Sequence, residues 1–140
     1  MGMAQRRGSS DDPRKLRDLL SRTCLLAAEQ SVRSVVVGLA AGEGDLLFPE
    51  LVDFVESALR VEDSIFRMTR ERAVLFLADV DRGQADHVVE RLLAGFRERF
   101  PSAAPPEVTL GFLEISPQDG NLTLKDVLPA VFGGEARTTH

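Results

Sequence analysis

The order of the apolar segments constrains the fold of this chain more than any other feature. A β-branched, apolar run over 34–40 predicts a buried strand. It is followed by an amphipathic helix pattern that begins within 45–49 and ends near Arg60. Two short apolar runs, over 64–68 and 73–78, come next. The break between them is short and charged, which is typical of a hairpin turn.

A long helix pattern over 82–100 and a strand pattern over 108–115 complete the series. The resulting order, β-α-β-β-α-β, predicts an α+β fold of the ferredoxin-like, nucleotide-cyclase type. In that fold four strands form an antiparallel sheet and two helices pack on one face. A final short helix is expected over 122–132, and Pro129 is expected to kink it or cut it short.

The two ends of the chain lie outside this core pattern. Residues 1–11 are polar and aperiodic, and they predict a flexible tail, as do residues 133–140. An amphipathic N-terminal helix is expected over 12–31, with Asp12 as its N-cap and Pro13 at its first position. The core domain is therefore expected over 32–132.

Composition narrows the functional classes. The 140 residues carry a formal net charge of −5, which argues against a nucleic-acid binder that works through bulk charge. The single cysteine, Cys24, excludes a disulfide or a thiolate metal cluster within one chain. No apolar run is long enough to span a bilayer, so neither a membrane segment nor a signal peptide is expected. We expect a cytoplasmic protein that binds no nucleic acid and no membrane.

The segment 60–77 carries a recognisable pattern. It reads R-V-E-D, three residues, R-M-T-R-E-R-A, and then an apolar strand. It resembles the GGDEF (diguanylate cyclase) family, whose pattern is R-x-x-D, three residues, R-x-G-G-D-E-F and a strand. The resemblance extends to Gly44-Asp45, to Glu90-Arg91 and to the strand start at 108–111, and it covers roughly residues 32–132. It implies the same ferredoxin-like fold and a place in bacterial signalling.

The signature itself is changed at every position. Gly-Gly-Asp-Glu-Phe is replaced by Thr69, Arg70, Glu71, Arg72 and Ala73. Side chains in place of the two glycines obstruct the approach of a guanine nucleotide to the hairpin backbone. The guanidinium of Arg72 stands where the family has a carboxylate beside its metal, and it would repel Mg²⁺.

A second loss concerns the connection after the first strand. The family has a metal-binding aspartate and a short guanine-gripping helix there, whereas this chain has only the segment 38–43 before Gly44-Asp45. Glu43 and Glu71 are a poor substitute for the lost metal ligands. Phosphoryl transfer depends on positioning and electrostatics around the metal and the phosphates. We therefore expect no cyclase activity, no bound metal and no cofactor.

Three residues keep the register of the family's inhibitory site, which binds the product cyclic di-GMP. They are Arg60, Asp63 and Arg91. An arginine fork can pair with guanine O6 and N7, a carboxylate can accept from the guanine N–H groups, and arginine also binds phosphate. Arg60, Arg67, Arg70 and Arg72 are expected to crowd around one hairpin, near Arg91.

The same three residues have structural explanations. Arg60 could cap a helix, Asp63 could satisfy a turn or pair with Arg67, and Arg91 could be an ordinary solvated helix residue. A bare R-x-x-D is expected about once by chance in a chain this rich in arginine and aspartate. Only its position relative to the rest of the family pattern distinguishes this R-x-x-D from a chance occurrence.

Three hypotheses follow. The leading one is a catalytically inactive GGDEF-like module for regulation or interaction, with a protein partner or a homodimer formed through the N-terminal helix. The alternative is a cyclic di-GMP receptor that uses Arg60, Asp63 and Arg91. The third is a residual enzyme on the same scaffold. Packing of the N-terminal helix on its own sheet is an equal explanation for its apolar stripe.

Overall fold

The computed structural model describes residues 11–101, 107–119, 122–133 and 137–139. From α1 to α4, the helices and strands follow the order that the apolar segments predict. The elements are α1 (Pro13–Gln30), β1 (Ser34–Ala41), α2 (Phe48–Ala58), β2 (Ser64–Arg67), β3 (Arg72–Leu77), α3 (Arg82–Arg99), β4 (Val108–Ile115), α4 (Leu124–Phe132) and β5 (Arg137–Thr139).

The strands form one antiparallel sheet in the order β2-β3-β1-β4-β5. The first four strands have the ferredoxin-like order, because each β-α-β crossover skips one strand and a strand from the other unit fills the gap. Residues 133–140 were expected to be a flexible tail, and this is wrong for Arg137–Thr139, which pair with β4 as β5. Residues 134–136 and 140 lie outside the described residues.

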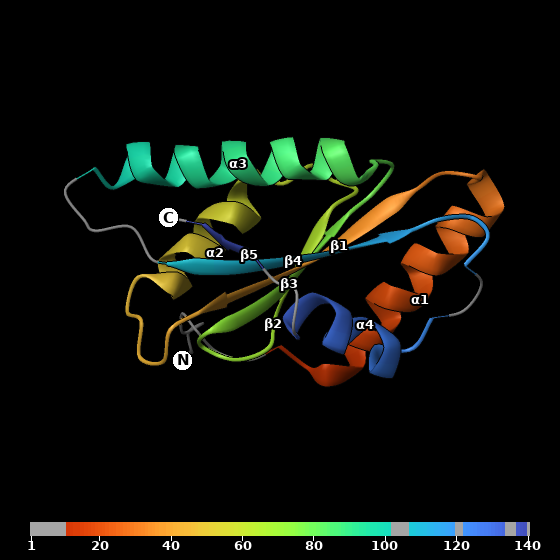
Figure 1. The fold of residues 1–140 in the computed structure, drawn as a ribbon, viewed down its shortest axis with the longest axis horizontal. Coiled ribbons are helices and arrows are strands. Elements are labelled where there is room, and N and C mark those ends of the chain that lie inside the picture. Colours follow the sequence, from red (N-terminus) through yellow and green to blue (C-terminus); the bar gives the residue numbers. More distant parts are fainter. Residues whose placement is uncertain (1–10, 102–106, 120–121, 134–136, 140) are drawn as a thin grey trace, which may run out of the picture.

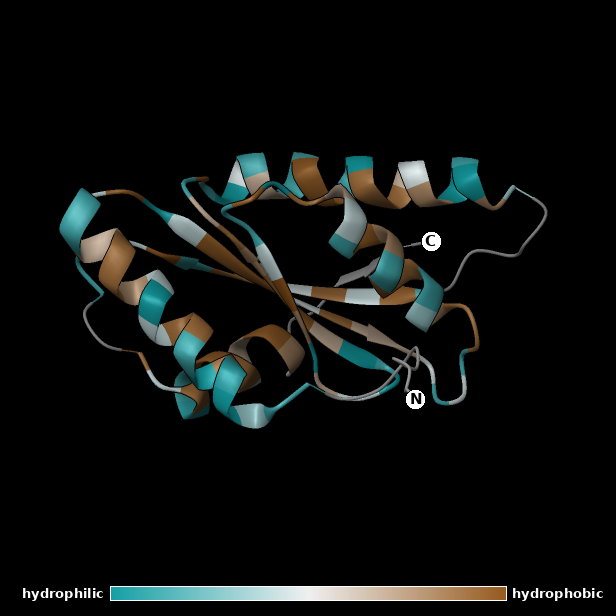
Figure 2. Cartoon of the chain, turned by 180° about the vertical axis from the view of Figure 1, so that it is seen from behind, coloured by the Kyte–Doolittle hydropathy of each residue, from teal (hydrophilic) through white to brown (hydrophobic). Residues whose placement is uncertain are grey.

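Helices cover both faces of the sheet (Figure 1). Strand residues alternate between the faces: Val35 and Val37 of β1 pack with α2 and α3, whereas Val36 packs with α1 and α4. The sequence predicted α2 and α3 on one face correctly, but it left the second face open. Figure 2 shows hydrophilic and hydrophobic bands alternating along α1 and α3, as one-sided burial requires.

Helix α1 packs on its own sheet. Asp12 caps it, because its carboxylate accepts a hydrogen bond of 3.0 Å from the backbone N–H of Arg14, and Pro13 follows. Its apolar stripe is buried in the core between α1, α4 and the strands; the stripe consists of Leu16, Leu19, Leu20, Cys24 and Ala27. A homodimer cannot use this stripe without removing the helix from the core.

Asp11 joins the start of the chain to the edge of the sheet. Its backbone N–H donates to the carbonyl of Arg67 at 2.9 Å, and its carboxylate accepts from the N–H of Arg67 at 2.8 Å. The predicted tail over 1–11 is therefore wrong at its last residue, while residues 1–10 lie outside the described residues.

Helix α4 lies directly on two paired glycines. Gly38 of β1 faces Gly111 of β4, and a Cβ added to either would come within 2.5 Å or 2.2 Å of the Val131 carbonyl oxygen. Pro129 lies inside α4 and does not end it: the helix runs on to Phe132 because Val127 and Val131 stay buried on the sheet. The packing of this turn offsets the hydrogen bond that the proline cannot donate.

Candidate functional site

The predicted site residues lie at opposite ends of the β2–β3 hairpin. Arg60 and Asp63 precede β2, so they lie at the end where the strands open, beside Ala78. Thr69 to Arg72 form the turn and the start of β3 at the other end. The expected crowding of four arginines around one hairpin is therefore wrong, because a length of strand separates Arg60 from Arg70 and Arg72.

At the open end, Arg60 and Asp63 hold each other in a bidentate ion pair. The Arg60 Nε and Nη2 donate to Asp63 Oδ2 and Oδ1, both at 2.8 Å. The spacing has a local cause, since the N–H of Asp63 donates to the carbonyl of Arg60 at 3.0 Å and closes a β-turn. The R-x-x-D spacing places both side chains on the same side of that turn.

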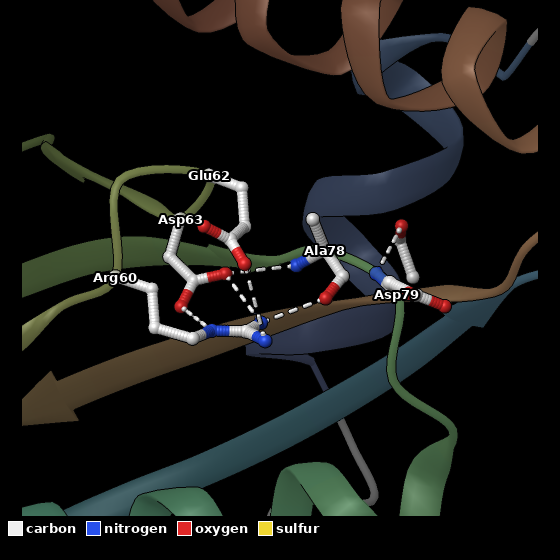
Figure 3. Close-up of polar contacts among 6 residues, drawn as sticks. Arg60, Glu62, Asp63, Ala78 and Asp79 are labelled. Atoms are coloured by element: carbon white, nitrogen blue, oxygen red, sulfur yellow. Dashed lines mark hydrogen bonds and ion pairs between the residues drawn. The ribbon is translucent and has the colours of Figure 1, made fainter.

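Both side chains also bind the backbone just beyond β3 (Figure 3). Arg60 Nη2 donates to the carbonyl of Ala78 at 2.7 Å, and Asp63 Oδ1 accepts from the N–H of Ala78 at 3.0 Å. We call Arg60, Asp63 and Ala78 the clasp. It joins the two strands where their ladder ends, and Ala78 is a partner that side-chain motifs alone do not reveal.

Burial differs sharply within the clasp. The side chain of Asp63 is 3% exposed, whereas that of Arg60 is 46% exposed, with Glu62 Oε2 at 3.4 Å from its Nη1. Hydrogen bonding to Asp63 raises the pKa of Arg60 against the opposing effect of burial. A ligand approaching from solvent therefore meets one edge of a guanidinium, while the carboxylate lies behind it.

Next to the clasp, the chain turns sharply into α3. Asp79 has φ of +56°, a conformation that aspartate tolerates better than most residues, and its N–H points at Ser34 Oγ at 3.4 Å (Figure 3). Asp81 then caps α3 in a capping box with Gln84. This turn orients the backbone of Ala78 toward Arg60 and Asp63.

Arg67 pairs with α2 and not with Asp63. Its Nη2 donates to Asp53 at 2.7 Å and to Glu56 at 2.8 Å, and its side chain is only 16% exposed. Hydrogen bonding to Glu56, and then to Asp53, raises the pKa of Arg67 although burial opposes it. The predicted pairing of Asp63 with Arg67 is wrong, and so is helix capping by Arg60, since α2 ends at Ala58.

Arg91 lies apart from the clasp. It is exposed on α3, whose buried residues include Val89 and Leu93 on either side of it. No hydrogen bond or ion pair joins Arg91 to Arg60 or Asp63, all three of which the structure describes. The structure thus joins two of the three candidate ligand-binding residues and leaves the third as a solvated helix residue.

At the turn end, Glu71 holds the connection between β1 and α2. Its carbonyl accepts from the N–H of Ala41 at 2.8 Å, and its Oε2 accepts from the N–H of Gly44 at 3.3 Å. Gly44 has φ of +78°, which glycine adopts without strain. We call Glu71 the loop anchor, because it holds the connection before α2 to the hairpin turn, 27 residues away in sequence.

The other residues of the segment 69–73 each lie in a different environment. Thr69 and Arg70 are exposed, and the N–H of Thr69 donates to the carbonyl of Arg72 at 3.2 Å. The guanidinium of Arg72 lies 5.3 Å from the ring centre of Phe132 on α4. Ala73 is fully buried beneath α2 and α3.

The connection over 42–47 contains no helix. Asp45 Oδ1 accepts from the N–H groups of Leu47 at 2.8 Å and Phe48 at 3.1 Å, and so stabilises the first turn of α2. Glu43 is exposed. Within the described residues, no group of three or more His, Cys, Asp or Glu side chains is placed to hold a metal ion. None of the described helices is long and apolar enough to cross a membrane.

Comparison with known proteins identifies the fold. No family model matches the sequence, and no curated protein matches it either. Solved structures do match: the GGDEF domain of FimX from Pseudomonas aeruginosa has a TM-score of 0.66 at 15% identity over 87% of this chain and 88% of that one.

Two further structures agree. The GGDEF domain of DgcB from Caulobacter crescentus, solved in complex with c-di-GMP, has a TM-score of 0.68 at 15% identity, covering 93% of this chain and 87% of that one. The diguanylate cyclase SiaD from Pseudomonas aeruginosa, solved with its activator SiaC, has a TM-score of 0.67 at 19% identity over 89% of this chain and 55% of that one. This chain has the fold of a GGDEF domain.

Proposed function

We propose that this domain is a catalytically inactive, GGDEF-like module that regulates or binds other molecules in cyclic di-GMP signalling. The fold supports the signalling context, since the similar structures are GGDEF domains. The residues at the turn end of the hairpin, where the resemblance places the family's signature, support inactivity.

The proposal rests on one observation, the hydrogen bond between Glu71 and the loop before α2. The carboxylate of Glu71 binds the N–H of Gly44, so the loop and the hairpin turn are tied together. Arg70 and Arg72 flank it with positive charge, and Thr69 and Arg70 carry side chains where the family has an open glycine backbone. The helix-free connection over 42–47 offers no second set of ligands beside it. Phosphoryl transfer requires both metal and phosphates to be positioned, and neither requirement is met there.

Incubation with GTP and either Mg²⁺ or Mn²⁺ tests inactivity. We expect no cyclic di-GMP by chromatography, for the wild type and for a variant with Thr69→Gly and Arg70→Gly. The variant matters because it reopens the hairpin backbone and leaves the connection over 42–47 unchanged. Product from the wild type would refute the proposal. Product from the variant alone would place the whole defect in the hairpin and refute the role given to the connection.

The second candidate function is a cyclic di-GMP receptor. The exposed edge of Arg60 favours it, because Nη1 faces Glu62 and solvent while the rest of the guanidinium is engaged in the clasp. Guanine recognition by Asp63 would require its nearly buried carboxylate to leave both Arg60 and the N–H of Ala78. Each broken hydrogen bond to a charged group costs about 1.5–3 kcal/mol, so the closed clasp opposes binding.

Calorimetric titration with cyclic di-GMP at about 50 μM protein decides this candidate. Absence of heat removes it. If binding occurs, Arg60→Ala alone is an ambiguous variant, because it also breaks the clasp. Arg91→Ala is the matched variant, since Arg91 is exposed and lies outside the clasp. Loss of binding in both variants, with the fold intact by circular dichroism, would establish the receptor.

A further inference from the structure

A cleft opens between α2 and the end of α3, which lie on the same face of the sheet (Figure 1). It has a volume of about 220 Å³, and one water molecule fills about 10–15 Å³ of such a space. The cleft therefore has room for a long side chain. Its lining residues are Glu50, Asp53, Phe54, Ser57, Arg99 and Phe100.

Phenylalanine rings form the apolar part of the cleft. The Phe54 ring meets Phe96 edge-on, with ring centres 5.9 Å apart, and the Phe96 ring centre lies 4.7 Å from that of Phe100. Gly95 allows this packing, because a Cβ there would come within 3.0 Å of Phe54 Cζ. Phe54 and Phe100 are only partly buried, so they contribute aromatic surface to the cleft. Aromatic surface beside carboxylates is an environment that favours a guanidinium.

The charges beside these rings are unbalanced. Glu50, Asp53 and Glu56 bring three carboxylates of α2 to this region, against the two guanidiniums of Arg67 and Arg99. Arg67 is shared, because the same Nη2 donates to both Asp53 and Glu56. Arg99 is exposed to solvent. One more guanidinium would neutralise this group of side chains.

The chain itself brings an arginine pair close to this cleft. Arg6 and Arg7 precede Asp11, whose backbone N–H donates to the carbonyl of Arg67 at 2.9 Å. The side chain of Arg67 spans the distance from that point to Asp53. The cleft therefore begins within one arginine side chain of the place where the segment is held. Four residues separate Arg7 from Asp11 and can extend over about 13 Å, so the arginine pair can reach the cleft.

We propose that the segment before Asp11 binds in this cleft through its Arg6-Arg7 pair. One guanidinium lies between the carboxylates of Glu50 and Asp53 and against the phenylalanine rings. Neighbouring side chains of an extended segment point to opposite sides, so one arginine of the pair faces the cleft in either register. The attachment at Asp11 holds the segment at an effective concentration in the millimolar range, which favours it over a second copy or a separate partner. The inference goes beyond the proposed function, since it involves neither GTP nor cyclic di-GMP.

Trypsin cleavage after Arg6 and Arg7 tests the contact directly, because trypsin must bind the same guanidinium in its specificity pocket. Binding in the cleft slows cleavage in proportion to the fraction of chains in which the segment is bound. We expect Glu50→Gln to speed cleavage of the full chain at least about threefold, followed by mass spectrometry at early times. Glu43→Gln is the matched control, because it removes the same charge from an exposed residue of the loop before α2. Equal rates for the wild type and Glu50→Gln overturn the proposal.

Amide chemical shifts of the full chain provide an independent readout. Joint exchange of Arg6→Ser and Arg7→Ser should shift the amides of Ser57 and Phe100, which line the cleft. The same exchange made in the Glu50→Gln variant should shift them less than half as far. Unchanged amides at the cleft, in a variant whose circular dichroism matches the wild type, overturn the proposal.

Two further outcomes would assign the shifts to other causes. Arg17→Ser with Arg22→Ser removes the same charge from exposed positions of α1, and it should leave the cleft amides unmoved. Equal shifts from this control would indicate an effect of net charge and overturn the proposal. Wild-type shifts at the cleft that vary between about 50 μM and 1 mM protein would assign the occupant to a second copy, which overturns it as well.

Discussion

The two ends of the β2–β3 hairpin have opposite characters. At the open end, the clasp joins Arg60, the nearly buried Asp63 and the backbone of Ala78 through four hydrogen bonds of 2.7–3.0 Å. At the turn end, Thr69 and Arg70 are exposed, and the contact that Glu71 makes with Gly44 is longer, at 3.3 Å. The open end carries the R-x-x-D residues, and the turn end carries the segment 69–73, where the resemblance places the GGDEF signature.

This difference gives the R-x-x-D motif a structural role of its own. Asp63 satisfies a backbone N–H that no strand partner reaches, so its loss would leave buried polar groups unpaired. The residues of the turn are surrounded by water, which can replace most of their contacts. The presence of R-x-x-D in this chain therefore has a structural explanation that does not require cyclic di-GMP.

Removal of the clasp carboxylate should have the largest effect. We expect Asp63→Ala to lower the free energy of unfolding by about 2–3 kcal/mol, because the Ala78 N–H and the Arg60 guanidinium lose their shared acceptor. Asp63→Asn keeps an acceptor and should lose about half as much. Urea denaturation measures both. Equal stability of Asp63→Ala and wild type would refute the structural explanation of the clasp.

Arg67, at the turn end of β2, tests whether burial or position along the hairpin determines how much a substitution destabilises the protein. Its side chain is mostly buried and pairs with Asp53 and Glu56. Arg67→Met should therefore lower the free energy of unfolding by about 1–2 kcal/mol, although Arg67 lies near the turn end. Methionine preserves the aliphatic packing of the stem. A loss below the error of urea denaturation would mean that position along the hairpin, and not burial, decides stability.

The loop anchor should contribute less. Glu71→Ala removes the acceptor of the Gly44 N–H, and we expect a loss of about 0.5–1 kcal/mol. Faster hydrogen exchange at the Gly44 amide, measured by NMR, should accompany it. Glu43→Ala is the control from the same loop, since the Glu43 side chain is exposed. Unchanged exchange at Gly44 in Glu71→Ala would show that the loop does not depend on this contact.

Arg70 at the tip of the turn should matter least. Arg70→Gly replaces an exposed side chain, and the expected change in the free energy of unfolding stays within about 0.5 kcal/mol. A loss comparable with that of Asp63→Ala would remove the contrast between the two ends of the hairpin. Thermal unfolding followed by circular dichroism is sufficient to measure it.

Local pattern was enough to predict most of the elements and part of the candidate site. The bounds of β4 agree with the predicted strand, and Asp12 caps α1 as expected, because both depend on neighbouring residues. The pairing of Arg60 with Asp63 also has a local origin in a β-turn, whereas the sequence suggested that Asp63 satisfies a turn or pairs with Arg67. Ala78, Asp53 and Glu56 could not be identified as partners, since the fold brings them together from other elements.

By itself, the sequence determined the order of helices and strands and hence the ferredoxin-like sheet, because apolar periodicity and end-capping act over a few residues. Only the tertiary structure decided which polar and apolar groups are buried and what they contact. The apolar stripe of α1 packs on the sheet, α4 packs on Gly38 and Gly111, and Asp63 is buried behind Arg60. These contacts form between elements that are far apart in sequence. The free energy of burying a polar group depends on whether such a contact provides it with a partner.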